Sequence, residues 1–134
     1  MLDGIFGNMN YLQKGLDAAS LRNEVISNNI ANVDTPGFKR SDVEFESYFK
    51  AALEDGGFTA KTTRDKHIKF SSSIDGVSPL TVQDNSTSMR MDGNNVDIDA
   101  ENALLAANTI YYDTLVEKLN SEITRLSIVI NEGK

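Results

Sequence analysis

The first 34 residues, MLDGIFGNMNYLQKGLDAASLRNEVISNNIANVD (1–34), decide the fold class of this chain. Positions three and four residues apart, in alternation, form one series in which nine of ten members are apolar. The series is Leu2, Ile5, Met9, Leu12, Leu16, Ala19, Asn23, Ile26, Ile30 and Val33. A heptad pattern of this length is typical of a helix packed along a partner helix. We therefore predict an N-terminal helix within residues 1–34.

The residues that follow end this helix. Pro36 disfavours the helical conformation at Thr35, and Gly37 permits a sharp turn. The helix is thus expected to stop before the Thr35-Pro36-Gly37 stretch.

The other end of the chain repeats the pattern, and eight of its ten series members are apolar. They are Ile98, Asn102, Leu105, Thr109, Tyr112, Val116, Leu119, Ile123, Leu126 and Ile130. Asp97, Asp99 and Glu101 suit the positive N-terminal end of a helix. We predict a second helix over residues 96–132, paired with the first as a long antiparallel, coiled-coil-like hairpin in a mainly α fold.

Residues 35–95 are predicted to be a turn followed by a polar insert, because only ten of residues 54–95 are apolar. Two segments alternate polar and apolar residues, His67–Phe70 and Ser88–Met91, and they could pair as a small β-hairpin. The alternative is an insert that stays disordered until assembly. The two helices and this insert then form a single, discontinuous domain.

The second helix carries further apolar residues outside its series. They are Leu104, Ile110, Tyr111, Leu115, Ile128 and Val129. A two-helix hairpin would expose them, and exposed apolar stripes usually mark an assembly surface. The alternative is a monomeric bundle with additional helices, which the polar insert is poorly suited to supply.

Composition excludes several functions. The chain has 134 residues, a net charge of −7, one His and no Cys. A thiolate zinc site, a cysteine nucleophile and a two-histidine site are excluded, and an acidic chain is a poor binder of nucleic acid or anionic lipid. No paired catalytic groups are recognisable. We expect no enzyme activity, no cofactor, no metal, no nucleic-acid partner and no direct lipid binding.

The N-terminus has neither the basic region nor the apolar core of a cleavable signal peptide. On this reading the chain would be cytoplasmic, unless it leaves the cell by a route that needs no cleaved signal.

One stretch resembles a known family. The motif Asn29-Ile30-Ala31-Asn32, followed by Thr35-Pro36-Gly37-Phe38, is similar to the N-terminal signature of bacterial flagellar rod and hook proteins. Among them, the short proximal-rod members also resemble this chain at Thr62-Thr63 with His67-Ile68, and at Asp92–Asp97 before the last helix.

This resemblance implies a structural subunit of the basal-body proximal rod, a helical tube that transmits torque from motor to hook. Such proteins are exported by the flagellar type III apparatus without a cleaved signal and reside in the periplasmic rod. The implied partners are copies of the chain itself, FliE below, FlgC or other rod proteins above, and export-gate proteins. The alternatives are another short axial protein such as FlgC, or a cytoplasmic coiled-coil adapter.

Two groups of residues carry these expectations. Those expected to pack between helices and subunits are Leu12, Leu16, Ile26, Ile30, Leu105, Tyr112, Val116, Leu119, Ile123 and Leu126. Asn28, Asn29 and Asn32 are expected to bond either the backbone of their own chain or neighbouring subunits near the helix end.

Phe45 and Phe49 resemble an export-gate recognition motif of early flagellar substrates. The alternative is that they are packing residues of a short helix over Ser41–Leu53.

Overall fold

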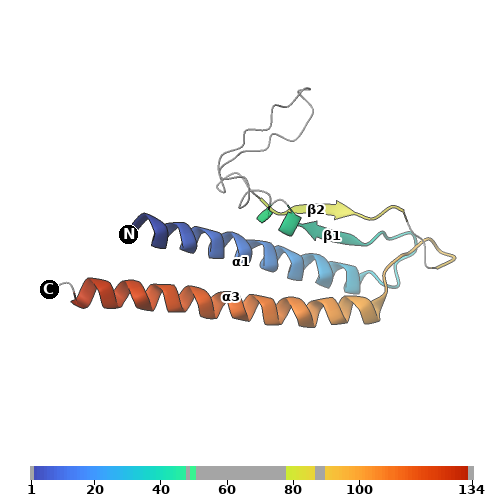
Figure 1. The fold of residues 1–134 in the computed structure, drawn as a ribbon. Coiled ribbons are helices and arrows are strands. Elements are labelled where there is room, and N and C mark those ends of the chain that lie inside the picture. Colours follow the sequence, from blue (N-terminus) through green and yellow to red (C-terminus); the bar gives the residue numbers. More distant parts are fainter. Residues whose placement is uncertain (1, 48, 51–77, 87–89, 133–134) are drawn as a thin grey trace, which may run out of the picture.

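The structure is a computed structural model that describes residues 2–47, 49–50, 78–86 and 90–132. Its elements are α1 (Leu2–Ala31), β1 (Ser41–Glu44), β2 (Leu80–Gln83) and α3 (Ile98–Glu132). The long helices lie side by side with both chain termini at the same end, and the two strands lie along α1 on the side away from α3 (Figure 1). The mainly α hairpin predicted from the sequence is thereby confirmed.

Contacts along the hairpin show its antiparallel order. Midway along the two helices, a Cβ on Gly15 would lie 3.2 Å from Cδ1 of Leu115. Further along, Asn108 Nδ2 donates to the carbonyl of Ala19 at 2.8 Å. Rising numbers in α1 therefore meet falling numbers in α3, and Gly15 lets the two helices approach closely.

Both helix ends are explained by local chemistry. At the end of α1, the Asn32 N–H donates to the carbonyls of Asn28 and Asn29, and Gly37 has a left-handed φ of 71°. At the start of α3, Asp97 Oδ1 accepts hydrogen bonds from the N–H groups of Asp99 and Ala100 at 3.0 and 3.3 Å. Asp97 is thus an N-cap, as the acidic cluster there suggested.

The small sheet lies elsewhere than predicted. β1 pairs antiparallel with β2, with Ser41 opposite Gln83 and Glu44 opposite Leu80. Of the two predicted strands, His67–Phe70 lies outside the described residues, as do Ser88 and Met89, while Arg90 and Met91 form a bend and a turn. The predicted helix over Ser41–Leu53 is wrong in its first four residues, because β1 occupies them.

The strand is preferred there because of what it buries. Val43 and Phe45 are buried against α1, in one cluster with Ala18 and Val25. Phe49 stacks on Phe45 with ring centroids 5.0 Å apart, and it meets Tyr11 edge-on at 6.1 Å. At Ser41–Glu44, the packing of Val43 and Phe45 against α1 therefore outweighs any local preference for a helix.

The face of α3 toward α1 departs from the strict heptad. Tyr112 and Ile123, which belong to the heptad series, are exposed in this single chain, whereas Leu115, expected outside it, is half-buried. A helix of 3.6 residues per turn drifts from a 3.5-residue repeat by about 20° per heptad.

Among the helices described, none is long and apolar enough to cross a membrane.

Candidate assembly interface

A buried polar cluster joins α1, β1 and the start of α3. We call it the junction and define it as Asn29, Arg40, Ser41, Asn95 and Glu101. Asn29 Nδ2 donates to the Ser41 carbonyl at 2.8 Å and to Glu101 Oε2 at 3.1 Å, and Asn29 Oδ1 accepts from the Ser41 N–H at 3.0 Å. Asn95 Oδ1 accepts from the Arg40 N–H at 2.7 Å. Three segments far apart in sequence are thereby fixed at one point.

An ion pair lies at the centre of the junction. Arg40 Nε meets Glu101 Oε1 at 2.5 Å, and the Glu101 side chain is 1% exposed. Burial disfavours the charge on Arg40, but the hydrogen bond and attraction from Glu101, aided by Asp42, outweigh it and raise the pKa of Arg40 above its ordinary value. Arg40 therefore stays charged beside Glu101.

Asn94 closes the turn after α1. Its Nδ2 donates to the carbonyls of Asn32, Val33 and Thr35 at 2.9 to 3.0 Å, and its Oδ1 accepts from the Val96 N–H. Carbonyls at a helix end need such partners because no intrahelical donor reaches them. The turn after α1 is thus tied to the segment that begins α3.

Two glycines of left-handed conformation meet beside this turn. The Gly37 N–H donates to the Asp92 carbonyl at 2.9 Å, and a Cβ on Gly93 would lie 3.7 Å from the Gly37 Cα. Gly93 has a φ of 85°. The turn therefore requires glycine for its backbone conformation.

The family-motif residues divide between this framework and the surface. Asn29 is in the junction, and Asn32 donates to the Asn28 carbonyl and accepts from Thr35. Ile30 and Phe38 are half-buried, while Ala31, Thr35, Pro36 and Gly37 are exposed. The intrachain role expected of the asparagines is therefore present for Asn29 and Asn32, the Asn28 side chain is exposed, and contacts with neighbouring subunits stay a prediction.

Exposed apolar side chains recur along α3. Those at least 37% exposed are Ile98, Leu104, Ile110, Tyr111, Tyr112, Ile123, Ile128, Val129 and Ile130. We call these residues the α3 stripe. Five of the six residues expected to be exposed belong to it, and the sixth is Leu115. Water contact at so many large apolar groups is typical of a surface that another protein covers.

The residues expected to pack between subunits are placed as follows. Ile26 is buried, Tyr112 and Ile123 belong to the α3 stripe, and the others are half-buried: Leu12, Leu16, Ile30, Leu105, Val116, Leu119 and Leu126. The half-buried majority retains surface that further helices would cover.

Sequence patterns did not identify the polar residues that matter most here. The patterns indicated only a helix-start charge at Glu101 and only the family-like stretch Asp92–Asp97 at Asn94 and Asn95, and they indicated no role for Arg40 or Asn108. The available signal was the close spacing of Asn94, Asn95 and Glu101 before an apolar helix. In the described part of the chain, no group of three or more His, Asp or Glu side chains is placed to hold a metal ion.

A helical hairpin that has the polar junction at one end and the exposed α3 stripe along one helix is typical of a subunit that assembles with other proteins. Its relatives agree with this class. The family described as "Flagella basal body rod protein" matches residues 9–39. Flagellar basal body rod protein FlgB of Bacillus subtilis is 37% identical over 128 residues, covering 96% of each chain.

Other bacteria contain similar proteins. FlgB of Yersinia enterocolitica is 34% identical over 99% of this chain and 100% of its own length. FlgB of Borreliella burgdorferi is 34% identical over 92% of this chain and 95% of its own length. The chain therefore belongs to the flagellar basal body rod protein family.

Proposed function

We propose that this chain is a non-catalytic structural subunit of the proximal rod, which assembles through α1 and α3 and transmits torque from the motor to the hook. The observation that carries the proposal is the α3 stripe, together with similarity to rod proteins over nearly the whole chain. Burying one such side chain is worth about 1.5–3 kcal/mol, so packing among copies would supply a large driving force.

The junction supports the mechanical part of this proposal. A tube that transmits torque needs subunits whose helices do not slide or splay under load. Asn29 and Arg40 both bind Glu101, which locks the end of α1 to the start of α3. Closely packed protein interiors transmit strain, and the junction lies in such an interior, so a load on one helix would pass to the other.

The proposed partners follow from this position: copies of the chain, FliE below, FlgC or other rod proteins above, and export-gate proteins during transit. The proposed location is the periplasmic rod, reached through the flagellar type III apparatus without a cleaved signal.

The packing of Phe45 bears on export. Phe45 is 3% exposed and stacks on Phe49, so both rings serve as packing residues in the folded chain. Recognition of these rings by an export gate would therefore require an unfolded chain. Changing Phe45 to Ala should abolish secretion while the chain is still synthesised, with Phe38→Ala as the control outside the proposed motif. Normal secretion of the Phe45 variant would remove the export role.

Deletion of the gene tests the main proposal. Electron microscopy of purified basal bodies should show the membrane rings without the rod, and the cells should be immotile until the gene is restored. Intact rods and swimming cells would contradict the proposal and favour a cytoplasmic adapter.

A further inference from the structure

The side of α3 that packs against α1 contains polar side chains. The buried or half-buried residues of α3 are Glu101, Leu105, Asn108, Leu115, Val116, Leu119, Glu122 and Leu126. Three of these eight are polar. With Leu115 they form a set at seven-residue intervals, and seven residues make nearly two helical turns, so the four lie in one row along the helix. We call Glu101, Asn108, Leu115 and Glu122 the inner row.

The next residue along from each member gives a second row that is better suited to burial. We call Asn102, Thr109, Val116 and Ile123 the outer row; it carries no charge and two branched apolar side chains. Ile123 is nevertheless 48% exposed. Successive residues lie about 100° apart around a helix, so turning α3 by about half that angle would bring the outer row against α1 in place of the inner row. Apolar burial alone favours the turned arrangement, so other contacts hold α3 as observed.

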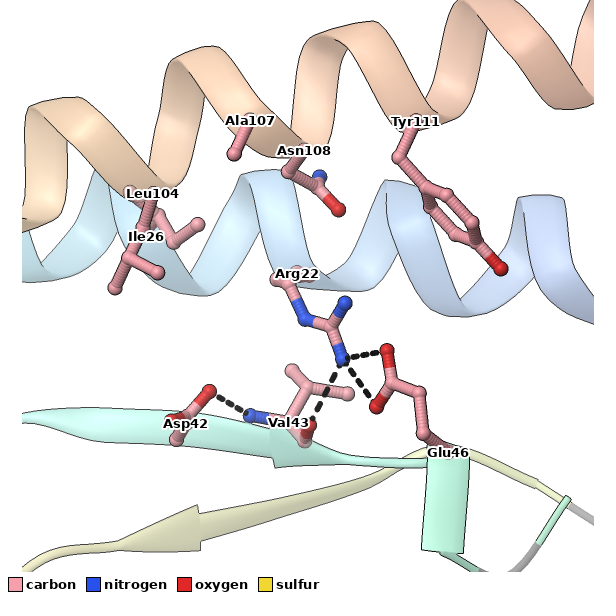
Figure 2. A pocket seen from close by; sticks show the side chains of 9 residues that line it. All are labelled: Arg22, Ile26, Asp42, Val43, Glu46, Leu104, Ala107, Asn108 and Tyr111. Atoms are coloured by element: carbon pink, nitrogen blue, oxygen red, sulfur yellow. Dashed lines mark hydrogen bonds and ion pairs between the residues drawn. The ribbon is translucent and has the colours of Figure 1, made fainter. Parts of the chain in front are cut away.

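Asn108 makes such a contact near the middle of the hairpin. Its Nδ2 donates to the Ala19 carbonyl at 2.8 Å and to Asn23 Oδ1 at 2.7 Å. Figure 2 shows the side chain extending from α3 toward α1, between Leu104 and Tyr111. Both acceptors belong to α1, so a turn of α3 would break both hydrogen bonds.

The same amide destabilises the hairpin in another way. Asn108 Oδ1 is buried, and no donor within the described residues reaches it. A buried acceptor without a donor carries an uncompensated desolvation cost. An asparagine between packed helices commonly fixes which of several packings forms, at a cost in stability. Asn108 has these properties of a residue that determines specificity.

We propose that Asn108 and Asn23 set the rotation of α3 about its axis and thereby keep Ile123 outside the hairpin, for contact with a neighbouring copy. The rotation is a property of the single chain, and only the contact with a neighbouring copy rests on the proposed function. The junction holds the inner row at Glu101. The amide pair holds it a second time, seven residues or about 10 Å along the helix.

Disulfide formation in the purified chain reports the rotation, since the chain contains no natural Cys. A Cβ on Gly15 would lie 3.2 Å from Cδ1 of Leu115, so Gly15→Cys is combined with Leu115→Cys in one variant and with Val116→Cys in another. The first pair should link about fivefold faster than the second, which is the ratio that one ordinary hydrogen bond supports. Adding Asn23→Leu with Asn108→Leu should abolish or reverse this preference.

Two exposed amides on the same helices provide the matched control. Gln13→Leu with Asn120→Leu adds the same apolar groups outside the helix contact and should leave the preference unchanged. A preference that persists without Asn23 and Asn108 would overturn the proposal, and so would an equal loss of preference in the control.

Urea unfolding, followed by circular dichroism, gives a second measurement. The Asn23→Leu, Asn108→Leu chain should unfold at the same urea concentration as the parent or at a higher one, because the change removes the buried acceptor. The groove that Asn108 lines beside α1 and β1, with a volume of about 490 Å³, leaves space for the larger side chain. A lower midpoint or a loss of helical signal would show that the amide pair is an ordinary stabilising contact, and would overturn the proposal.

Swimming tests the contact with a neighbouring copy, in a strain that is immotile when the gene is deleted. Cells that carry the Asn23→Leu, Asn108→Leu chain should lose motility, and cells that carry the control chain should swim. Normal swimming of the former would overturn the role of the rotation in assembly. The disulfide test needs no rod, so its result is independent of any failure of the proposed rod function.

Discussion

The side chain of Asn29 binds the backbone of Ser41 through both of its polar atoms, donating to the carbonyl at 2.8 Å and accepting from the N–H at 3.0 Å. This pair of bonds fixes the first residue of β1 to the last turns of α1. An amide is the only side-chain group of this length that offers a donor and an acceptor side by side. The same Nδ2 also reaches Glu101 in α3, so one residue binds three elements.

Changing Asn29 to Asp should therefore reduce the free energy of unfolding by about 3 kcal/mol, because a carboxylate loses the donor and faces the buried Glu101. Urea unfolding of the purified chain, followed by circular dichroism, measures this loss. Asn28→Asp is the control, since the Asn28 side chain is exposed. Equal stability of the two variants would show that the Asn29 amide is dispensable.

The ion pair between Arg40 and Glu101 should be strongly stabilising as a unit. Changing Glu101 to Gln leaves Arg40 with only the exposed Asp42 as a charged partner, and the expected loss is about 3 kcal/mol. Thermal unfolding measures it, with Glu117→Gln at an exposed position of α3 as the control. A loss below about 0.5 kcal/mol, as at ordinary surface sites, would contradict a structural role.

The raised pKa of Arg40 predicts how its contribution depends on pH. A cation whose pKa rises on folding adds stability that is fully present below its unfolded pKa and is lost only as pH rises through the folded value. Both values lie far above neutrality. Unfolding at about pH 6 and about pH 9 should therefore show no loss attributable to Arg40. The comparison is with the double variant Arg40→Met with Glu101→Met, which leaves no unpaired buried carboxylate. A difference between wild type and this double variant that changes over this range would contradict this.

Gly93 tests the turn that ties the two helices together. Its φ of 85° strains any residue with a Cβ, so Gly93→Ala should cost about 1–2 kcal/mol. Gly93→Asn should cost less, because Asn tolerates the left-handed conformation better. Thermal unfolding of both variants measures the difference, and an Ala variant as stable as the Asn variant would show that the backbone relaxes.

Ile26 tests the helix contact itself. It is 3% exposed, and Ile26→Asp would bury a carboxylate beside Val43 and Leu104, while the nearby Arg22 is already paired with Glu46, at a cost of several kcal/mol. The cells should then lose motility and the purified chain should lose helical signal. Ser27→Asp, at an exposed neighbour, should leave both unchanged. Normal swimming of the Ile26 variant would contradict the hairpin as the assembled form.

The helical pattern predicted the large features because burial repeats along a helix with a regular period. Leu16 and Leu105 follow that period, and the predicted bounds at residues 34 and 96 lie three and two residues from the observed ends at Ala31 and Ile98. The turn at Gly37 was also predicted from the sequence, and its positive φ of 71° shows why glycine is needed there.

The junction and the strands could not be predicted from such patterns, because they depend on contacts between residues that are far apart in the sequence. Glu101 looks like an ordinary acid in the first turn of a helix, and only the approach of Arg40, 61 positions earlier, makes it a buried partner. β1 likewise pairs with β2 across a long sequence separation, so neither strand signals its partner.

The pairing of Glu44 with Leu80 also makes the chain modular. Because Glu44 and Leu80 lie opposite each other, the segment between them begins and ends at adjacent points. A longer or shorter segment there would leave the pairing of α1 and α3 unchanged. Lengthening a closed loop costs little, about 0.6 kcal/mol for each doubling. Proteins that share this helical framework can thus differ in the length of the segment between Glu44 and Leu80.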